Sequence, residues 1–170
     1  GSGSRAGGGA HKQYRRIAGR AVLAHAVDRL GAAGIDRIQV VIGEGQEDAY
    51  REAIGDRPLP APAIGGATRR QSVRNGLEAL QGSGAERVLI HDAARPFLPR
   101  AVVERLEAAL EASPAAVPAL PIVDTLARKN GGLGETLARD GLVRVQPPQA
   151  FRLADIMAAH RAWRGAEATD

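Results

Sequence analysis

The sequence contains no cysteine, and aromatic residues make up only 3% of its 170 residues. Without cysteine there are no disulfides and no thiolate chemistry, which is compatible with the cytoplasmic location that we expect. So few aromatic rings leave no stacking platforms of the kind that bind single-stranded nucleic acid, so we expect no nucleic-acid partner. No apolar run approaches the roughly 20 residues of a membrane span, so we expect no membrane partner either.

The residues that are present suit one domain with a sizeable core. Apolar residues make up 44% of the chain, and with so few aromatics the core must be built from alanine, valine, leucine and isoleucine. The formal net charge is +4, which favours anionic ligands. Small phosphorylated molecules are therefore as good a ligand class as nucleic acid.

Helical and extended segments alternate along the chain. Apolar residues recur at helical spacing in five segments, namely 20–33, 46–55, 68–81, 99–112 and 153–165. Between them lie short apolar segments typical of buried strands, at 38–42, 61–66 and 86–96. This alternation predicts an α/β fold with a mostly parallel sheet and right-handed crossovers.

The segment 121–147 departs from this alternation. Two extended pieces flank KNGGLGE without a crossover helix, which predicts a protruding β-hairpin arm. A lone apolar hairpin is marginal in water. We therefore expect the arm to pair with the same arm of a two-fold partner, giving a homodimer. The alternative is an arm that folds back on its own sheet.

Ligands bind beyond the carboxyl ends of strands in an open parallel sheet, and that rule selects HDAARP at 91–96. Asp92 could meet a hydroxyl or a metal-bound phosphate, and Arg95 could offer a forked donor to an anion. The alternative is a polar turn in which Asp92 caps a helix. His91 has no partner at metal-ligand spacing, so we interpret it as structural.

The same rule selects IGGATRRQS at 64–72. Paired glycines let a ligand approach the backbone, and Ser72 lies near the start of a helix that Thr68 could cap. The alternative is a glycine turn with an ordinary cap. In that case Arg69 and Arg70 are solvated surface charges.

The third segment is the opening stretch, GSGSRAGGGAHKQY. It lacks the terminal GK[ST] of a Walker A loop. Glycines that expose backbone N–H groups, flanked by Arg5 and Lys12, could still cradle a triphosphate. A linker remnant is the alternative.

These three segments, together with PIVDTLAR and RDGLVRVQPPQAF, resemble the 2-C-methyl-D-erythritol 4-phosphate cytidylyltransferases of non-mevalonate isoprenoid synthesis. The resemblance covers essentially the whole chain. It implies a Rossmann-like fold of the nucleotide-diphospho-sugar-transferase type and transfer of a cytidylyl group from CTP to methylerythritol phosphate, with release of pyrophosphate. It also implies Mg²⁺ bound mainly through the CTP phosphates. The GGG before Lys12 resembles versions fused to a cyclodiphosphate synthase.

The resemblance also implies roles for individual residues. Arg5 and Lys12 would neutralise the triphosphate and the transition state. The groups expected to hold the nucleotide are Gly1, Gly3, Gly66, Ser72, Asp92 and Ala93. Those expected to hold the acceptor are Arg95, Thr125 and Arg139, and Arg139 would also act catalytically by reaching the neighbouring subunit's nucleotide loop.

Several departures from the family pattern bear on these roles. His11 stands where the family usually has proline, Ala67 where some members have aspartate, and Pro147 where a threonine usually contacts the acceptor. We expect residues 1–170 to form a single cytidylyltransferase domain without the family's first strand and C-terminal lysine segment. Two alternatives are a cytidylyltransferase for another polyol phosphate, such as ribitol 5-phosphate, and an inactive nucleotide-binding fragment.

Overall fold

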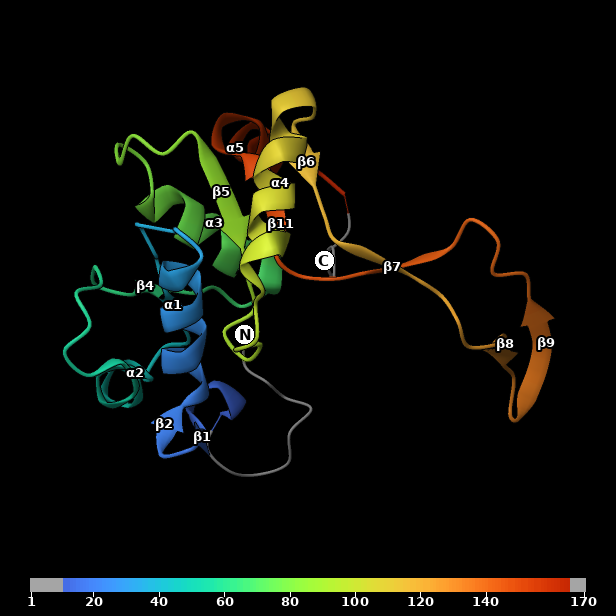
Figure 1. The fold of residues 1–170 in the computed structure, drawn as a ribbon, viewed down its shortest axis with the longest axis horizontal. Coiled ribbons are helices and arrows are strands. Elements are labelled where there is room, and N and C mark those ends of the chain that lie inside the picture. Colours follow the sequence, from blue (N-terminus) through green and yellow to red (C-terminus); the bar gives the residue numbers. More distant parts are fainter. Residues whose placement is uncertain (1–10, 166–170) are drawn as a thin grey trace.

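The computed structural model describes residues 11–165 and shows a body of helices packed around short strands, from which a long arm extends (Figure 1). The helices are η1 (Lys12–Tyr14), α1 (Val22–Ala32), α2 (Glu47–Ile54), α3 (Arg69–Ala79), α4 (Arg100–Ala112) and α5 (Leu153–Ala162). The strands of the body are β1 (Arg16–Ile17), β2 (Arg20–Ala21), β3 (Val41–Ile42), β4 (Ala63–Ile64), β5 (Arg87–Ile90), β6 (Ala115–Ala116) and β11 (Gln149–Arg152). The α/β class predicted from the sequence is confirmed.

The helices begin where the sequence places their caps. The Thr68 hydroxyl accepts a hydrogen bond from the Gln71 backbone N–H at 3.1 Å, which satisfies one donor in the first turn of α3. Pro99 immediately precedes α4, and its fixed φ suits a helix entry. The apolar face of α4 is then buried, with Val103 fully inaccessible to solvent.

The strands of the body pair in three separate sets, one of which is the antiparallel pair β1–β2. β3 and β4 form a parallel ladder that joins Val41 to Ala63. β11 lies between β5 and β6 and runs antiparallel to both, so β5 and β6 point in the same direction. The return of β11 into the body, after the arm, was not predicted from periodicity, because its two neighbours lie far back along the chain.

No ladder among residues 11–165 joins β3 to β5, and a cavity of about 1080 Å³ lies between them. Much of its lining is apolar and comes from α1, β3 and β5, including Val27, Val41 and Leu89. The buried core is correspondingly divided. One cluster packs α1 against β3 and α2, and two others pack α4 against β5 and β11.

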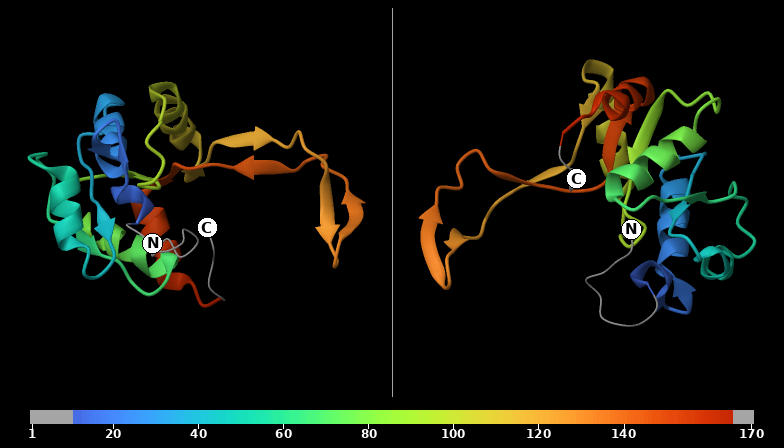
Figure 2. Two further views of the ribbon diagram at one scale, coloured as in Figure 1. Left: turned by 90° about the horizontal axis from the view of Figure 1, so that it is seen from below. Right: turned by 180° about the vertical axis from the view of Figure 1, so that it is seen from behind.

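The arm has two ribbons. β7 (Ala119–Pro121) pairs antiparallel with β10 (Val143–Val145), and β8 (Leu126–Lys129) pairs with β9 (Leu133–Leu137) beyond them. Every residue of β7 and β10 is exposed, and the arm stands clear of the body in two further views (Figure 2). The protruding hairpin predicted for 121–147 is therefore confirmed, and the arm does not fold back on its own body.

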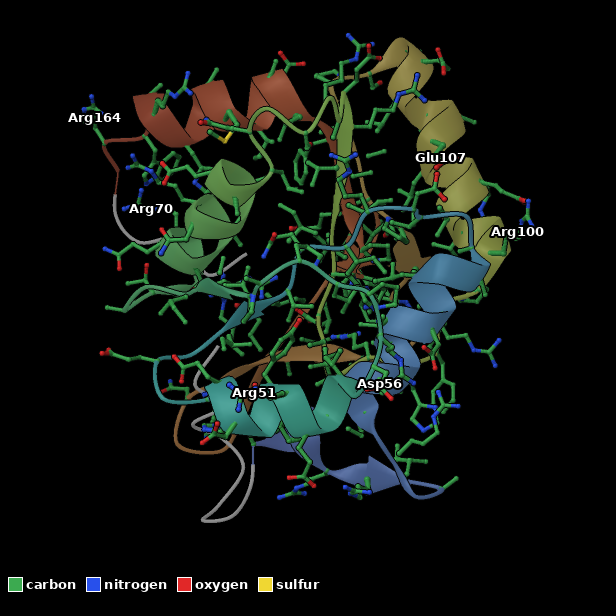
Figure 3. All side chains as sticks on the ribbon, turned by 90° about the vertical axis from the view of Figure 1, so that its left-hand side faces the viewer. Arg51, Asp56, Arg70, Arg100, Glu107 and Arg164 are labelled. Carbon is green, nitrogen blue, oxygen red and sulfur yellow. The ribbon has the colours of Figure 1, made fainter. Side chains whose placement is uncertain are left out.

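Charged side chains lie on the outside of the body, as Arg51, Arg100 and Glu107 show (Figure 3). None of the buried side chains in residues 11–165 is polar or charged. None of the helices in this part of the chain is long and apolar enough to cross a bilayer.

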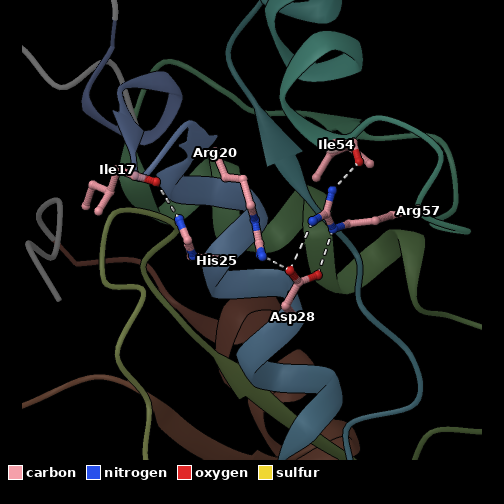
Figure 4. A network of polar contacts seen from close by, with 6 residues as sticks. All are labelled: Ile17, Arg20, His25, Asp28, Ile54 and Arg57. Carbon is pink, nitrogen blue, oxygen red and sulfur yellow. Dashed lines mark hydrogen bonds and ion pairs between the residues drawn. The ribbon is translucent and has the colours of Figure 1, made fainter.

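One ion-pair network joins α1 to its surroundings (Figure 4). Asp28 accepts hydrogen bonds from Arg57 Nε at 2.7 Å and Arg57 Nη2 at 3.0 Å, and it also pairs with Arg20. Arg57 Nη1 donates to the Ile54 carbonyl at 2.6 Å, at the end of α2. Hydrogen bonding from Arg57 lowers the pKa of Asp28 below its usual value.

Candidate active site

The cavity between β3 and β5 brings together residues from three distant parts of the chain. Its lining includes Lys12, Gly66, Thr68, Arg69, Ser72, His91, Asp92 and Ala93, and charged residues also line it elsewhere, such as Asp36, Arg37, Arg87 and Glu107. The structure thus collects five of the residues predicted to bind nucleotide or act on it, namely Lys12, Gly66, Ser72, Asp92 and Ala93. They meet because η1, the loop after β4 and the loop after β5 all open at the same edge of the body.

The Gly65–Gly66 turn is held by the first turn of α3. The Gly66 backbone N–H donates to the Ser72 hydroxyl at 3.1 Å, and that hydroxyl donates to the Thr68 carbonyl at 2.9 Å. A Cβ on Gly66 would lie 2.4 Å from the Gln71 Cβ, so only glycine fits without a shift. Because the Ser72 backbone N–H donates to the Thr68 carbonyl, Ser72 acts here through its hydroxyl, which shapes the turn.

The turn after β5 is organised around Asp92. Arg69 Nη1 donates to Asp92 Oδ1 at 3.1 Å, and Arg95 Nε lies 3.4 Å from Asp92 Oδ2. The Arg95 backbone N–H also donates to the Asp92 carbonyl at 2.9 Å. One carboxylate therefore holds two guanidinium groups beside the cavity.

Arg69 is a site residue that the sequence reading missed, because a solvated arginine and a paired one look alike in sequence. Its position at the first residue of α3, opposite the end of β5, is the signal that could have identified it. His91 has the structural role predicted for it, since its Nε2 donates to the Arg95 carbonyl at 2.8 Å. Its other ring nitrogen, Nδ1, is buried without a hydrogen-bond partner in residues 11–165.

Arg95 also links this turn to the base of the arm. Its Nη1 donates to Gln146 Oε1 at 3.3 Å, and the Gln146 backbone N–H donates to the Pro118 carbonyl at 2.9 Å. Gln146 is a second residue that carried no recognisable signal in the sequence. This contact places the exit of the arm beside the candidate site.

Two predicted acceptor-binding residues lie elsewhere in this chain. Thr125 precedes β8 and Arg139 follows β9, so both belong to the far half of the arm (Figure 2). Arg139 Nη1 donates to the Val123 carbonyl within the arm. The structure therefore does not bring them to the cavity of their own chain. The predicted residues Gly1, Gly3 and Arg5 lie outside the described residues.

The electrostatics of the lining favour an anion. Lys12 and Arg69 line the cavity, Arg95 adjoins it, and Asp92 is already paired with both arginines. A glycine turn beside a helix start, with cations around it, is an arrangement suited to phosphate. The fold and the site together define an α/β domain with a candidate anion-binding site.

The family model described as "IspD: 2-C-methyl-D-erythritol 4-phosphate cytidylyltransferase" matches residues 1–170, and the chain belongs to this family. A bifunctional enzyme IspD/IspF of Rhizorhabdus wittichii is 63% identical over the whole chain, which covers 44% of that protein. A 2-C-methyl-D-erythritol 4-phosphate cytidylyltransferase of Cereibacter sphaeroides is 48% identical over the whole chain, which covers 77% of it.

A solved structure agrees with the fold. The crystal structure of 4-diphosphocytidyl-2C-methyl-D-erythritol synthase from Anaerococcus prevotii superposes with a TM-score of 0.79 at 28% identity, covering 93% of this chain and 74% of that one. The family resemblance seen in the sequence is thereby confirmed, including the bifunctional relatives. The chain spans less than half the length of the bifunctional relative.

Proposed function

We propose that this chain transfers a cytidylyl group from CTP to 2-C-methyl-D-erythritol 4-phosphate, giving CDP-methylerythritol and pyrophosphate. One observation carries the proposal. Lys12, the Gly65–Gly66 turn and the Asp92 turn line one cavity in a chain that is 48% identical throughout to a protein bearing that activity in its name.

The reaction joins two anions. A phosphate oxygen of the acceptor attacks the α-phosphorus of CTP, the bond to the bridging oxygen breaks, and pyrophosphate leaves with that electron pair. Positioning and charge neutralisation can carry such a step without a covalent intermediate or a general base, because the acceptor phosphate is already ionised near neutral pH. In this proposal Lys12 and Arg5 neutralise the triphosphate, and Arg69 and Arg95 hold Asp92 at the rim of the cavity.

The nucleoside end of CTP would lie against the Gly65–Gly66 turn. Backbone groups there approach a ligand closely because neither glycine has a side chain, and Ser72 fixes the turn. A base held by backbone groups is read through its hydrogen-bonding edge, which differs between cytosine and the other bases. We therefore expect a preference for cytidine nucleotides.

Residues 11–165 contain no group of three or more His, Cys, Asp or Glu side chains that could hold a metal ion. Asp92 is the carboxylate nearest the anion-binding residues, and it is already ion-paired. This donor set fits Mg²⁺ that arrives on the triphosphate, because Mg²⁺ keeps several waters and takes few protein ligands. When bound, the ion would neutralise charge on the leaving pyrophosphate.

We also propose that two chains form one functional unit. The apolar side chains Leu120, Val143 and Val145 of the β7–β10 ribbon are each about half exposed, which leaves a large apolar surface without a partner in one chain. Pairing with the arm of a two-fold copy would bury them. The same pairing would let Thr125 and Arg139 reach the neighbour's cavity, which they do not reach in their own chain. A cytoplasmic location stays a prediction.

Pyrophosphate release tests the activity. With Mg²⁺ and CTP, we expect turnover with methylerythritol phosphate and much less with ribitol 5-phosphate. Preference for ribitol 5-phosphate would favour the alternative acceptor, and CTP binding without turnover would identify an inactive fragment. Calorimetry with CTP, UTP, ATP and GTP tests the nucleotide site, where preference for a purine would contradict the assignment.

A mixing experiment tests the shared site. Lys12→Ala and Arg139→Ala should each be nearly inactive alone. After co-refolding, half the dimers would be mixed and each would own one intact site, so activity should recover to about a quarter of wild type. No recovery, despite demonstrated subunit exchange, would place Arg139 outside the neighbour's site.

A further inference from the structure

The side chain of Gln46, which lies outside η1, forms three hydrogen bonds to the η1 turn that carries Lys12. Gln46 Oε1 accepts hydrogen bonds from the Tyr14 hydroxyl at 3.1 Å and from Gln13 Nε2 at 3.4 Å. Its Nε2 donates to His11 Nε2 at 3.1 Å. Gln46 thus contacts His11 and Gln13, which flank Lys12, and also Tyr14.

We infer that Gln46 is a positioning residue, which sets the place of the Lys12 ammonium for the reaction proposed above. Lys12 has a flexible stem, so the position of its charge depends on how firmly the turn beneath it is held. Misplacing a charged group by about 1 Å can cost on the order of 10² in rate. This inference therefore rests on the proposed function.

The Gln46 side chain bonds to the η1 turn and not to the start of its own helix, α2. Gln46 immediately precedes α2, where a polar side chain commonly caps the first N–H groups of the helix. It makes no such bond. Its backbone is fixed instead, since its N–H donates to the Gly43 carbonyl at 3.2 Å and its carbonyl accepts from the Tyr50 N–H at 2.8 Å.

Gly43 leaves the space that the Gln46 amide occupies. A Cβ at position 43 would lie 2.6 Å from Gln46 Nε2, closer than two such atoms can approach. Gly43 lacks a positive φ, so the backbone alone does not require glycine there. The missing side chain is what makes room for the amide.

The groups on the η1 turn complement the Gln46 amide, because they offer donors to its oxygen and an acceptor to its N–H. Tyr14 packs against the core cluster of α1, β3 and α2, and its burial raises its pKa, so its hydroxyl remains a donor near neutral pH. The amide N–H needs an acceptor, and His11 Nε2 lies 3.1 Å from the amide nitrogen.

The kinetic test uses four variants. Gln46→Ala removes the contact, and Gly43→Ala displaces the amide from a different residue. Both should lower kcat about 10-fold with the KM for CTP within about twofold, because the lost effect is on the transition state. Gln46→Glu keeps the acceptor oxygens toward Tyr14 and should recover part of kcat. Gln81→Ala is the matched control, since Gln81 is an exposed glutamine just after α3 and lies outside the cavity lining.

A double variant separates positioning from general destabilisation. If Gln46 acts through Lys12, adding Gln46→Ala to Lys12→Ala should lower kcat no further. A further loss of similar size on that background, or a kcat loss in Gln81→Ala equal to that in Gln46→Ala, would overturn the inference.

Trypsin cleavage after Lys12 gives a measurement that does not depend on turnover. Releasing the turn should speed cleavage there several-fold in Gln46→Ala and leave the rate in Gln81→Ala unchanged. Absence of cytidylyl transfer by the wild-type chain would refute the proposed function and not the grip of Gln46 on the turn. Unchanged cleavage at Lys12 in Gln46→Ala would refute that grip and with it the positioning role.

Discussion

Replacing Asp28 by asparagine should weaken the attachment of α1 to its neighbours. Asp28 accepts two hydrogen bonds from Arg57 and pairs with Arg20, and Arg57 in turn holds the end of α2 through the Ile54 carbonyl. Asparagine keeps the shape of the side chain and one acceptor oxygen. It removes the charge that attracts two guanidinium groups.

The expected loss in unfolding free energy follows from the exposure of the paired side chains. The Asp28 side chain is 40% exposed and that of Arg57 28% exposed, so solvent screens the pairs strongly. Exposed ion pairs contribute roughly 0.2–1 kcal/mol each. The two-point contact with Arg57 places its pair at the upper end, and the total loss should be about 1 kcal/mol. For a chain of this size that lowers the Tm by about 2–4 °C.

The pH dependence has a definite sign. The folded state lowers the pKa of Asp28 from the ordinary value of 3.8, so the carboxylate stabilises the fold at every pH above that value. The stabilisation is lost as pH falls through the lowered pKa. Urea unfolding of wild type and Asp28→Asn should therefore show a constant difference between about pH 5 and pH 8, which closes below about pH 4.

Glu104→Gln is the matched control. Glu104 pairs with Arg100 on the surface of α4, with both side chains more than half exposed, and the variant changes the net charge by the same amount. Such a pair is worth about 0.3–0.5 kcal/mol. Equal losses in Asp28→Asn and Glu104→Gln at neutral pH would refute the reasoning, as would a difference from wild type that does not narrow as the pH falls below about 4.

Three further outcomes are expected. Lys12→Ala should keep its Tm and lose about 10²–10³ in pyrophosphate release, and a folded variant with near-wild-type turnover would contradict the assignment. Thr68→Ala should lose about 1 kcal/mol in urea unfolding because the cap on Gln71 is gone, whereas Thr68→Ser should not. Gly66→Ala should raise the KM for CTP several-fold, since its Cβ would meet Gln71. Gly31→Ala, which meets nothing within 4 Å, should leave that KM unchanged.

Local features of the structure could be predicted from the sequence. Periodicity located each long helix, because the 3.6-residue repeat is a property of neighbouring residues. The Thr68 cap is local in the same sense. The meeting of Gly66 and Asp92 was also predicted, because each lies in a loop that follows a strand, and ligands of such folds bind beyond the carboxyl ends of the strands.

Long-range contacts could not be predicted in this way. Nothing in QAFR indicates that β11 pairs antiparallel with β5 and β6, because the residues of a strand do not identify the strands beside it. Arg69 looks like a surface charge until Asp92 is seen opposite it. Gln46 lies in a polar loop, and its three contacts depend on a turn more than thirty residues earlier in the chain.

The separation of β3 from β5 has a consequence for how the molecule fluctuates. No backbone hydrogen bond of a ladder in residues 11–165 crosses between them, so the two sets of strands need not open as one cooperative unit. Helix α1 covers both, with Leu23 and Val27 in one core cluster and Leu30 packed on another. Slowly exchanging amides should then fall into two groups with different opening free energies. The candidate site lies between the two sets of strands, so the width of the cavity would change when either set moves.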